Sequence, residues 1–264
     1  MNVHDTSAFV LSTRDYGESD RLITFYTQEG GKLKGIAKGA RRSQKRFVHA
    51  FEPCSLVALT YRERKSLIWV EACKLVEPHL ELRTDVERWG YGALVSEIVM
   101  EMTPEGECQP EVFSLFDATL GQLAGTKDPL NVILLFLIRF LDAMGYLPAL
   151  ENCCVCLRPI REDTRWWWHL QQGKLACSEH RSLQDGQLKL DLGTLVLIQQ
   201  ARRLALDKVW RLRLLQERKT PILHGVLDWI RDITRRELKS LRMLEQVCTE
   251  AGREGHIFGM DRTV

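Results

Sequence analysis

The sequence predicts an α+β protein in which a small β-barrel is followed by a helical domain that carries an inserted cysteine-rich module. Short β-rich runs separated by glycine-bearing turns fill the first 80 residues. Beyond them the apolar residues recur with a helical period, and two pairs of soft metal ligands interrupt the helical part. At 264 residues the chain is long enough for two domains of ordinary size.

The first 80 residues alternate between runs of β-forming residues and turn signals such as Tyr16-Gly17-Glu18 and Glu29-Gly30-Gly31. The predicted strands are Ser7–Arg14, Asp20–Thr27, Lys32–Ala37, Cys54–Tyr61 and Leu67–Lys74. Arg62–Ser66 is predicted to be a hairpin turn between the last two. Five short strands over this length indicate a small barrel. The candidate is the five-stranded nucleic-acid-binding barrel called the OB-fold, over residues 1–80.

Residues 81–252 are predicted to form an all-α domain, with 253–264 as a flexible tail. A capping box at Thr84-Asp85-Val86-Glu87 begins a helix that extends to about Met102. Further helices are predicted at Pro110–Ala124, from Asp128-Pro129 to Gly145, at Gly193–Leu206, and from Thr220-Pro221 to about Val247. The helix after Pro129 is apolar around most of its circumference, so we expect it to be the buried centre of this domain.

The inserted module, residues 150–182, contains a Cys-x2-Cys pair and a Cys-x2-His pair. Each turn can direct two ligands at one metal ion, and together they complete a tetrahedron around zinc. The predicted ligands are Cys153, Cys156, Cys177 and His180. Cys154 is left out because its spacing to Cys156 does not suit such a turn. Four protein ligands leave no open position, so we expect one structural zinc ion.

The stretch from residue 32 to 46 is strongly basic and contains no acidic residue. Its cations are Lys32, Lys34, Lys38, Arg41, Arg42, Lys45 and Arg46. Seven cations without counter-charges predict a surface that binds phosphates and cannot by itself read base identity. Because the chain's net charge is only +2, a nucleic-acid site must come from local clustering of this kind. The alternative is a solvated basic loop.

Several aromatic and basic residues allow two interpretations. Tyr16, Phe25 and Tyr26 could offer stacking platforms to single strands, although Phe25 is expected in the barrel core. In Trp166-Trp167-Trp168, at least two indoles should pack the small module rather than form an exposed surface. A second basic cluster on the last predicted helix is interleaved with acids, so it suits a solvated face as well as a DNA contact. Its members are Arg231, Arg235, Arg236, Lys239 and Arg242.

The sequence argues against membrane insertion and against catalysis. The longest apolar run, Val132 to Ile138, is too short to span a bilayer, and the N-terminus does not resemble a signal peptide. Eight cysteines in such a chain indicate metal ligands and free thiols in a cytoplasmic protein. There is no phosphate-binding glycine loop and no nucleophile–base arrangement. Glu63-Arg64-Lys65 resembles part of a metal-dependent nuclease motif, but it has no partner carboxylates at a useful spacing.

The chain resembles the RecO family of recombination mediators in bacterial DNA repair. The resemblance rests on Tyr16–Arg21 (YGESDR), on Thr27–Gly31, on Lys32–Arg42 (KLKGIAKGARR), and on Cys153 and Cys156 following Gly145-Tyr146-Leu147-Pro148. It covers nearly the whole chain. It implies an OB-fold followed by a helical domain with a zinc module, although His180 departs from the all-cysteine form of that site.

The resemblance also implies what the protein does. It implies binding of single- and double-stranded DNA and annealing of complementary strands, without enzymatic activity or a small-molecule substrate. Its expected partners are RecR, the C-terminal tail of single-strand-binding protein and, indirectly, RecA, in the cytoplasm at the nucleoid. Two other functions stay open: a zinc-containing, sequence-specific transcription or RNA-binding factor, and a metal-dependent nuclease.

Overall fold

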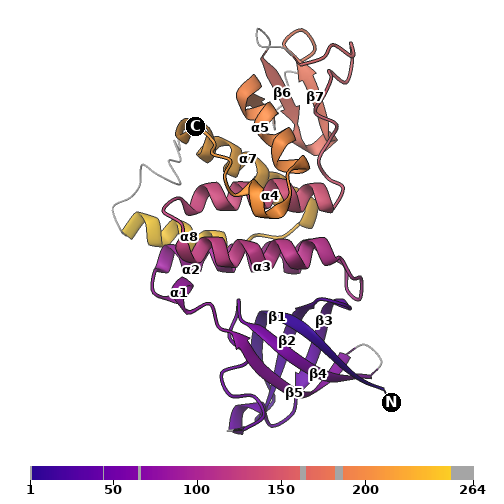
Figure 1. Ribbon diagram of the computed structural model, residues 1–264, viewed down its shortest axis with the longest axis vertical. Helices are drawn as coiled ribbons and strands as arrows, with labels where there is room; N and C mark the ends of the chain where they lie inside the picture. Colours follow the sequence, from indigo (N-terminus) through magenta and orange to yellow (C-terminus); the bar gives the residue numbers. More distant parts are fainter. Residues whose placement is uncertain (1, 44, 65–66, 161–164, 182–186, 251–264) are drawn as a thin grey trace. The chain divides into compact units, whose positions relative to one another are not determined.

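The computed structural model describes residues 2–43, 45–64, 67–160, 165–181 and 187–250. The chain divides into two compact units (Figure 1). The first contains residues 1–125 and 238–244, and the second contains residues 126–237 and 245–264. The predicted boundary at residue 80 separates the barrel from helices that belong to the same compact unit, and it stays a prediction. The predicted tail, 253–264, lies outside the described residues.

The first unit begins with a closed five-stranded barrel in the order β1-β2-β3-β5-β4. The strands are β1 (Val3–Tyr16), β2 (Asp20–Thr27), β3 (Gly31–Ala37), β4 (Leu56–Arg64) and β5 (Leu67–Glu77). β3 and β5 pair in parallel and all other pairs are antiparallel. This confirms the predicted OB-like barrel. Its interior is filled by inward-facing apolar residues, among them Val10, Ile23, Phe25, Leu59 and Val70.

Four of the strands are longer than predicted, and the pairing of β1 and β4 shows why. β1 begins at Val3 because its first half pairs with β4, from Val3 opposite Arg62 to Phe9 opposite Leu56. From Ala8 onward it pairs with β2, and this pairing has a register shift between Val10 and Ser12. Closing the barrel therefore requires a long first strand with an irregularity, which bends it from one neighbour to the other. β4 extends to Arg64, inside the predicted turn, because it pairs with β5 as far as Leu67.

Helices α1 (Leu80–Arg83), α2 (Val86–Met102) and α3 (Pro110–Gly125) complete the first unit together with the first half of α8 (Lys239–Glu250). The predicted capping residue of α2 was wrong by one position. Asp85 is the N-cap, and its carboxylate accepts hydrogen bonds from the backbone N–H groups of residues 87 and 88. Thr84 instead donates its hydroxyl to the carbonyl of Glu81 at the end of α1.

The barrel is fastened to the connection between α2 and α3 at the start of β3. The N–H of Gly106 donates to the carbonyl of Lys32 (3.0 Å). Gly31 has φ +62°, and a Cβ atom there would lie 1.8 Å from the carbonyl oxygen of Glu107. Only glycine satisfies both the left-handed backbone and this close approach. Phe9 of β1 packs on Phe113 and Phe116 of α3, with ring centroids 5.0 and 4.7 Å away.

The second unit is built around α4 (Pro129–Ala143), whose side chains are nearly all buried, as predicted. Asp128 caps this helix by accepting from the N–H of Asn131, and it also pairs with the buried ammonium of Lys219 at 2.5 Å. Around α4 lie α5 (Leu192–Arg203), α6 (Leu206–Val209), α7 (Gln216–Thr234) and a three-stranded sheet. The sheet has the order β7-β6-β8, formed by β7 (Lys174–Cys177), β6 (Trp166–His169) and β8 (Gln187–Leu190).

The single last helix predicted from Thr220 to about Val247 was wrong. Its residues belong to two helices, α7 and α8, with Pro221 inside the first. The break falls at Arg235, which has a left-handed backbone (φ 54°). The carboxylate of Glu97 on α2 accepts from the N–H groups of Lys239 and Ser240 and so caps the N-terminus of α8. Along the described residues, no helix has the length and apolar character needed to cross a membrane.

Candidate metal centre and nucleic-acid interface

The four predicted ligands come together at one point. Ligand atoms of Cys153, Cys156, Cys177 and His180 all lie within 4.8 Å of one another. The Sγ atoms of Cys156 and Cys177 are 3.9 Å apart, and Nδ1 of His180 lies 3.8 and 3.3 Å from the Sγ atoms of Cys153 and Cys177. A tetrahedral zinc site requires about 3.8 Å between sulfur ligands and about 3.5 Å between sulfur and nitrogen. The group therefore has the dimensions of a structural zinc site.

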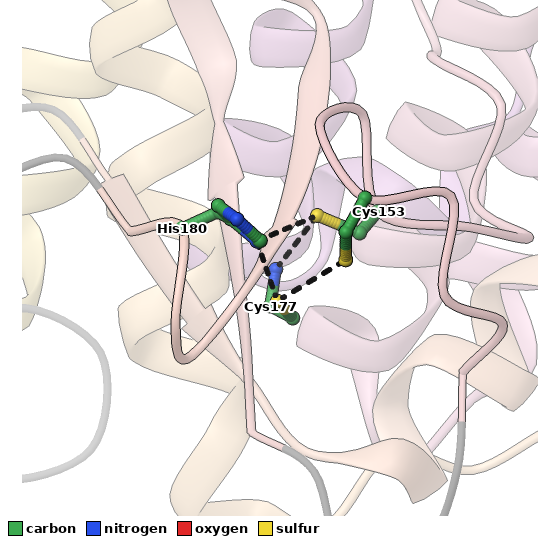
Figure 2. Close-up of side chains that lie close together, drawn as sticks. Cys153, Cys177 and His180 are labelled. Carbon is green, nitrogen blue, oxygen red and sulfur yellow. Dashed lines mark hydrogen bonds between the residues drawn. The ribbon is translucent and has the colours of Figure 1, made fainter.

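Local backbone hydrogen bonds hold the two ligand turns in place. In the first turn, the N–H of Cys153 donates to the carbonyl of Arg158 and the N–H of Leu157 donates back to Cys153. In the second, the N–H of His180 donates to the carbonyl of Cys177. Cys177 is also the last residue of β7, so the sheet fixes one ligand directly. Figure 2 shows Cys153, Cys177 and His180 pointing toward one another.

The surroundings of Cys153 favour its thiolate form. Burial opposes ionisation, but backbone N–H groups of Cys156, Cys177 and Val155 around the sulfur outweigh it, and the pKa of Cys153 falls to about 6. A thiolate is the form that binds metal. Cys154 is exposed and outside the ligand group, and partial desolvation, with the nearby Cys153 sulfur, raises its thiol pKa. Leaving Cys154 out of the ligand set agrees with this geometry.

An ion pair joins the two ligand turns next to the cluster. Both terminal nitrogens of Arg158 donate to the two carboxylate oxygens of Glu179, at 2.9 and 3.0 Å. Such two-point pairs fix orientation more firmly than a single contact. The pair therefore holds Cys156 and Cys177 near each other through their chain neighbours.

The tryptophan run lies on β6, beside the ligand turns. Trp166 pairs with Cys177 across the sheet. Trp166 and Trp168 are fully buried, with 0% and 1% exposure, whereas Trp167 is partly exposed. Trp168 packs edge-on against Trp229 of α7, with centroids 5.9 Å apart. This confirms the prediction that at least two of the three indoles pack the module.

The seven cations of the stretch from residue 32 to 46 do not share one environment. Lys32 is buried, and its Nζ donates to the carbonyl oxygen of Met100 at 2.5 Å, because the end of α2 and the following connection cover this part of β3. Lys34 is exposed but pairs with the carboxylate of Glu105. The expectation of cations without counter-charges therefore fails here. Glu105 supplies the acid from a segment distant in sequence.

The remaining five cations are exposed and lie in the loop after β3, which we call the basic loop (residues 38–46). They are Lys38, Arg41, Arg42, Lys45 and Arg46. Arg41 has an acidic neighbour, Asp15, with Nε 3.5 Å from the carboxylate. Arg42 and Lys45 form no ion pair with any residue that the structure describes. The exposed positive charge of this region is therefore concentrated in the basic loop.

The basic loop is held by the turn between β1 and β2. The carboxylate of Asp20 accepts from the N–H of Gly39 and from the hydroxyl of Ser19, both at 2.9 Å. The carbonyl of Ser19 accepts from the N–H of Arg41 at 3.0 Å. The hydrogen bond from Gly39 is the main reason that the pKa of Asp20 lies below its ordinary value. Asp20 is therefore ionised at neutral pH and anchors the loop there.

Replacing Asp20 with asparagine is expected to weaken DNA binding roughly two- to tenfold, because a loosened loop must be ordered on binding. Salt-matched affinities for a single-stranded oligonucleotide measure the effect. The substitution makes the net charge more positive, so electrostatics alone would strengthen binding. Asp5→Asn is the control, since it makes the same change at a carboxylate that accepts a hydrogen bond from Thr60 on the neighbouring strand, away from the basic loop. Equal affinities for the two variants would contradict an anchoring role.

The predicted stacking aromatics are placed differently from one another. Phe25 and Tyr26 are fully buried, so neither can stack on a base, and burial raises the pKa of the Tyr26 hydroxyl. Tyr16 is 52% exposed, at the turn that anchors the basic loop. The sequence reasoning missed Trp69. The sequence signal that could have found it is the alternation in Leu67–Val70 (LIWV). Ile68 and Val70 face the barrel core, so Trp69 between them faces outward.

The second basic cluster does not lie on one helix as predicted. Arg231 is on α7, Arg235 and Arg236 lie beyond its end, and Lys239 and Arg242 are on α8. Arg231 pairs with Asp228 one turn earlier. The helix break at Arg235 separates the cluster.

The region resembling a nuclease motif lies at the end of β4. Glu63 and Arg64 are exposed strand residues, and residue 65 lies outside the described part of the chain. In the described ranges, the ligand cluster at Cys153 is the one group of three or more His, Cys, Asp or Glu side chains placed to hold a metal ion.

Comparison with known proteins agrees with this architecture. Residues 1–79 match the family model described as "Recombination protein O N terminal", and residues 83–242 match "Recombination protein O C terminal". The chain is 56% identical over 246 residues to the DNA repair protein RecO of Syntrophobacter fumaroxidans, covering 93% of this chain and 98% of that protein. It is 30% identical over 248 residues to the DNA repair protein RecO of Syntrophus aciditrophicus, covering 92% and 96%.

These matches extend over both the barrel and the helical region, and the matched parts include the basic loop and all four candidate ligands. The chain therefore belongs to the RecO family, the non-enzymatic recombination mediators of DNA repair.

Proposed function

We propose that this protein binds single- and double-stranded DNA through the basic loop and anneals complementary strands. The observation that carries this proposal is a loop of five exposed cations, fixed at its start by Asp20 and Ser19, on the surface of an OB-like barrel. Contacts of this kind neutralise phosphates, gain affinity from counterion release and carry no sequence information. Annealing requires these properties, because the bases of both strands must stay available for pairing.

The partners are part of the same proposal. The protein acts with RecR and the C-terminal tail of single-strand-binding protein, and so helps to load RecA, in the cytoplasm at the nucleoid. Family membership supports this role. The arginines of the second basic cluster that lie in the second unit, Arg231, Arg235 and Arg236, remain candidates for holding an acidic tail, since a carboxylate is held best by arginine.

One structural zinc ion held by Cys153, Cys156, Cys177 and His180 completes the proposal. The ligand separations and the thiolate-favouring surroundings of Cys153 support it. With all four tetrahedral positions supplied by protein, the metal would stabilise the module and would not activate water.

A strand-annealing assay on complementary DNA coated with single-strand-binding protein tests the function. The protein should accelerate annealing without a nucleotide cofactor, and less so when the coating protein lacks its C-terminal tail. Equal rates with and without the protein would contradict annealing, and equal acceleration on both coats would contradict tail binding. Strong preference among unrelated oligonucleotides would instead favour a sequence-specific factor. Cleavage of labelled DNA with magnesium or manganese would favour a nuclease.

A further inference from the structure

Trp69 is an outward-facing indole on the barrel. It lies on β5 between Ile68 and Val70, whose side chains are buried in the barrel core. Its neighbours on the adjoining strands are Ile36 of β3 and Arg62 of β4. The residue is partly exposed, although a tryptophan of the barrel gains most by burial. Packing of the core therefore does not explain this residue.

Two cations cover the Trp69 ring. Nζ of Lys38, the first residue of the basic loop, lies 4.5 Å from the ring centroid. The guanidinium carbon of Arg64, the last residue of β4, lies 3.8 Å from it. At that distance a guanidinium rests on the face of an aromatic ring. Both side chains belong to exposed residues, and neither forms an ion pair with a residue that the structure describes.

We propose that the Trp69 indole is a stacking platform for one base of single-stranded DNA, with Lys38 and Arg64 binding the flanking phosphates. This inference rests on the proposed function and identifies the part of the interface that distinguishes single strands. When a strand arrives, the cations turn from the ring to the phosphates and the base takes the uncovered face. Single-strand sites combine cations that follow the backbone with aromatic platforms in this way.

Duplex DNA offers no equivalent contact at Trp69. Its bases are stacked inside the helix, and extracting one costs unpairing energy. The cations of the basic loop meet phosphates on either form of DNA. The basic loop therefore binds single and double strands alike, whereas the Trp69 ring binds single strands alone.

Other aromatics with a cation or an exposed ring differ from Trp69: Trp167 has one arginine over its ring, Arg181 at 5.5 Å, and lies in the cysteine-rich module of the second unit. Trp89 on α2 also has an arginine over its ring, Arg83 at 5.5 Å, but that arginine is paired with Glu52. Tyr16 lies next to the acids Asp15 and Glu18. Trp69 is the aromatic that joins the basic loop to a second cation at a strand end.

The test is a salt series of affinities for a single-stranded oligonucleotide and its duplex, with Trp69→Thr and the control Trp89→Ala. Threonine keeps the strand preference and removes the ring. Single-strand affinity should fall roughly five- to hundredfold with Trp69→Thr. Its slope against salt and the duplex affinity should stay at the wild-type values, because no phosphate contact is lost. Trp89→Ala should bind both forms as wild type does, and circular dichroism confirms folding.

Fluorescence provides a second measurement that does not depend on the threonine variant folding. Stacking should quench the Trp69 emission, so single-stranded DNA should quench the wild type more than Trp69→Phe. Two results together would overturn the stacking role: Trp69→Thr binds single strands as tightly as the wild type, and DNA quenches Trp69→Phe as much as the wild type. If these proteins still bind DNA in a salt-dependent way, the proposed function is unaffected. Equal losses for single strands and duplex would also overturn it. If the wild type binds neither form of DNA, the proposed function itself fails.

Discussion

Cys153→Ser and Cys177→Ser are each expected to release zinc and to unfold the module that contains the two ligand turns and the sheet β7-β6-β8. Structural zinc contributes folding free energy on the order of 10 kcal/mol in small metal-dependent modules. Here the loss should be partial, because Trp168 still packs against Trp229. Metal analysis should find about one zinc ion per chain in the wild type and little in either variant. Near-ultraviolet circular dichroism should follow the loss of packing around Trp166 and Trp168.

Cys154→Ser is the matched control, since it changes the adjacent thiol, which is exposed and outside the ligand group. It should keep the metal and the wild-type spectrum. Affinity for DNA should survive in all three variants, because the basic loop belongs to the other compact unit. If freshly purified protein that has never been exposed to a chelator contains no zinc, the proposed metal site is wrong. Loss of zinc in Cys154→Ser equal to that in Cys153→Ser would contradict the ligand assignment.

The double substitution Arg41→Glu with Arg42→Glu is expected to lower the affinity for single- and double-stranded DNA about a hundredfold or more. Each lost phosphate contact lowers the slope of log affinity against log salt by about 0.9, and the new carboxylates add repulsion. Arg42 should contribute more than Arg41, because Arg41 lies beside Asp15. Affinities over a salt series measure both effects, and annealing should fall with them. Both side chains are exposed, so the fold should be unaffected.

Lys208→Glu with Arg211→Glu is the control for net charge. Each of the two double variants changes the formal net charge from +2 to −2, since two cations become two anions. Lys208 and Arg211 are exposed and belong to the second unit, so this control should bind DNA nearly as the wild type does. If both doubles lose affinity equally, bulk charge rather than the basic loop governs binding. If the folded Arg41→Glu, Arg42→Glu double variant keeps the wild-type affinity and salt slope, the basic loop is solvated and does not contact DNA.

The sequence predicted well those features that depend on neighbours along the chain. Each ligand pair lies within one turn, so its spacing alone indicated the metal cluster. The barrel followed from five short β-forming runs separated by glycine-bearing turns, which are signals between near neighbours in the sequence. The largest local error was the last helix, where Pro221 was interpreted as a start. It lies inside α7 instead, and the chain breaks at Arg235, which no local signal marked.

Features that depend on contacts between distant segments could not be predicted. Lys32 and Lys34 look equivalent in sequence, yet the end of α2 buries the first and Glu105 neutralises the second. The setting of Trp69 likewise arises because β3 pairs in parallel with β5 and brings Lys38 to the ring. The alternation in Leu67–Val70 could have indicated that Trp69 faces outward, but not which cations lie over its ring.

The junction at Gly31 affects how the protein can be divided for experiments. Phe9 of the barrel is covered by Phe113 and Phe116, and the start of β3 is bonded to the connection before α3. A fragment cut after residue 80 would leave that aromatic face in water and the ammonium of Lys32 without its carbonyl acceptor. Such a fragment would tend to aggregate, and its extra cation would exaggerate binding to any polyanion. Dissection of DNA binding is therefore best done by substitution in the intact chain.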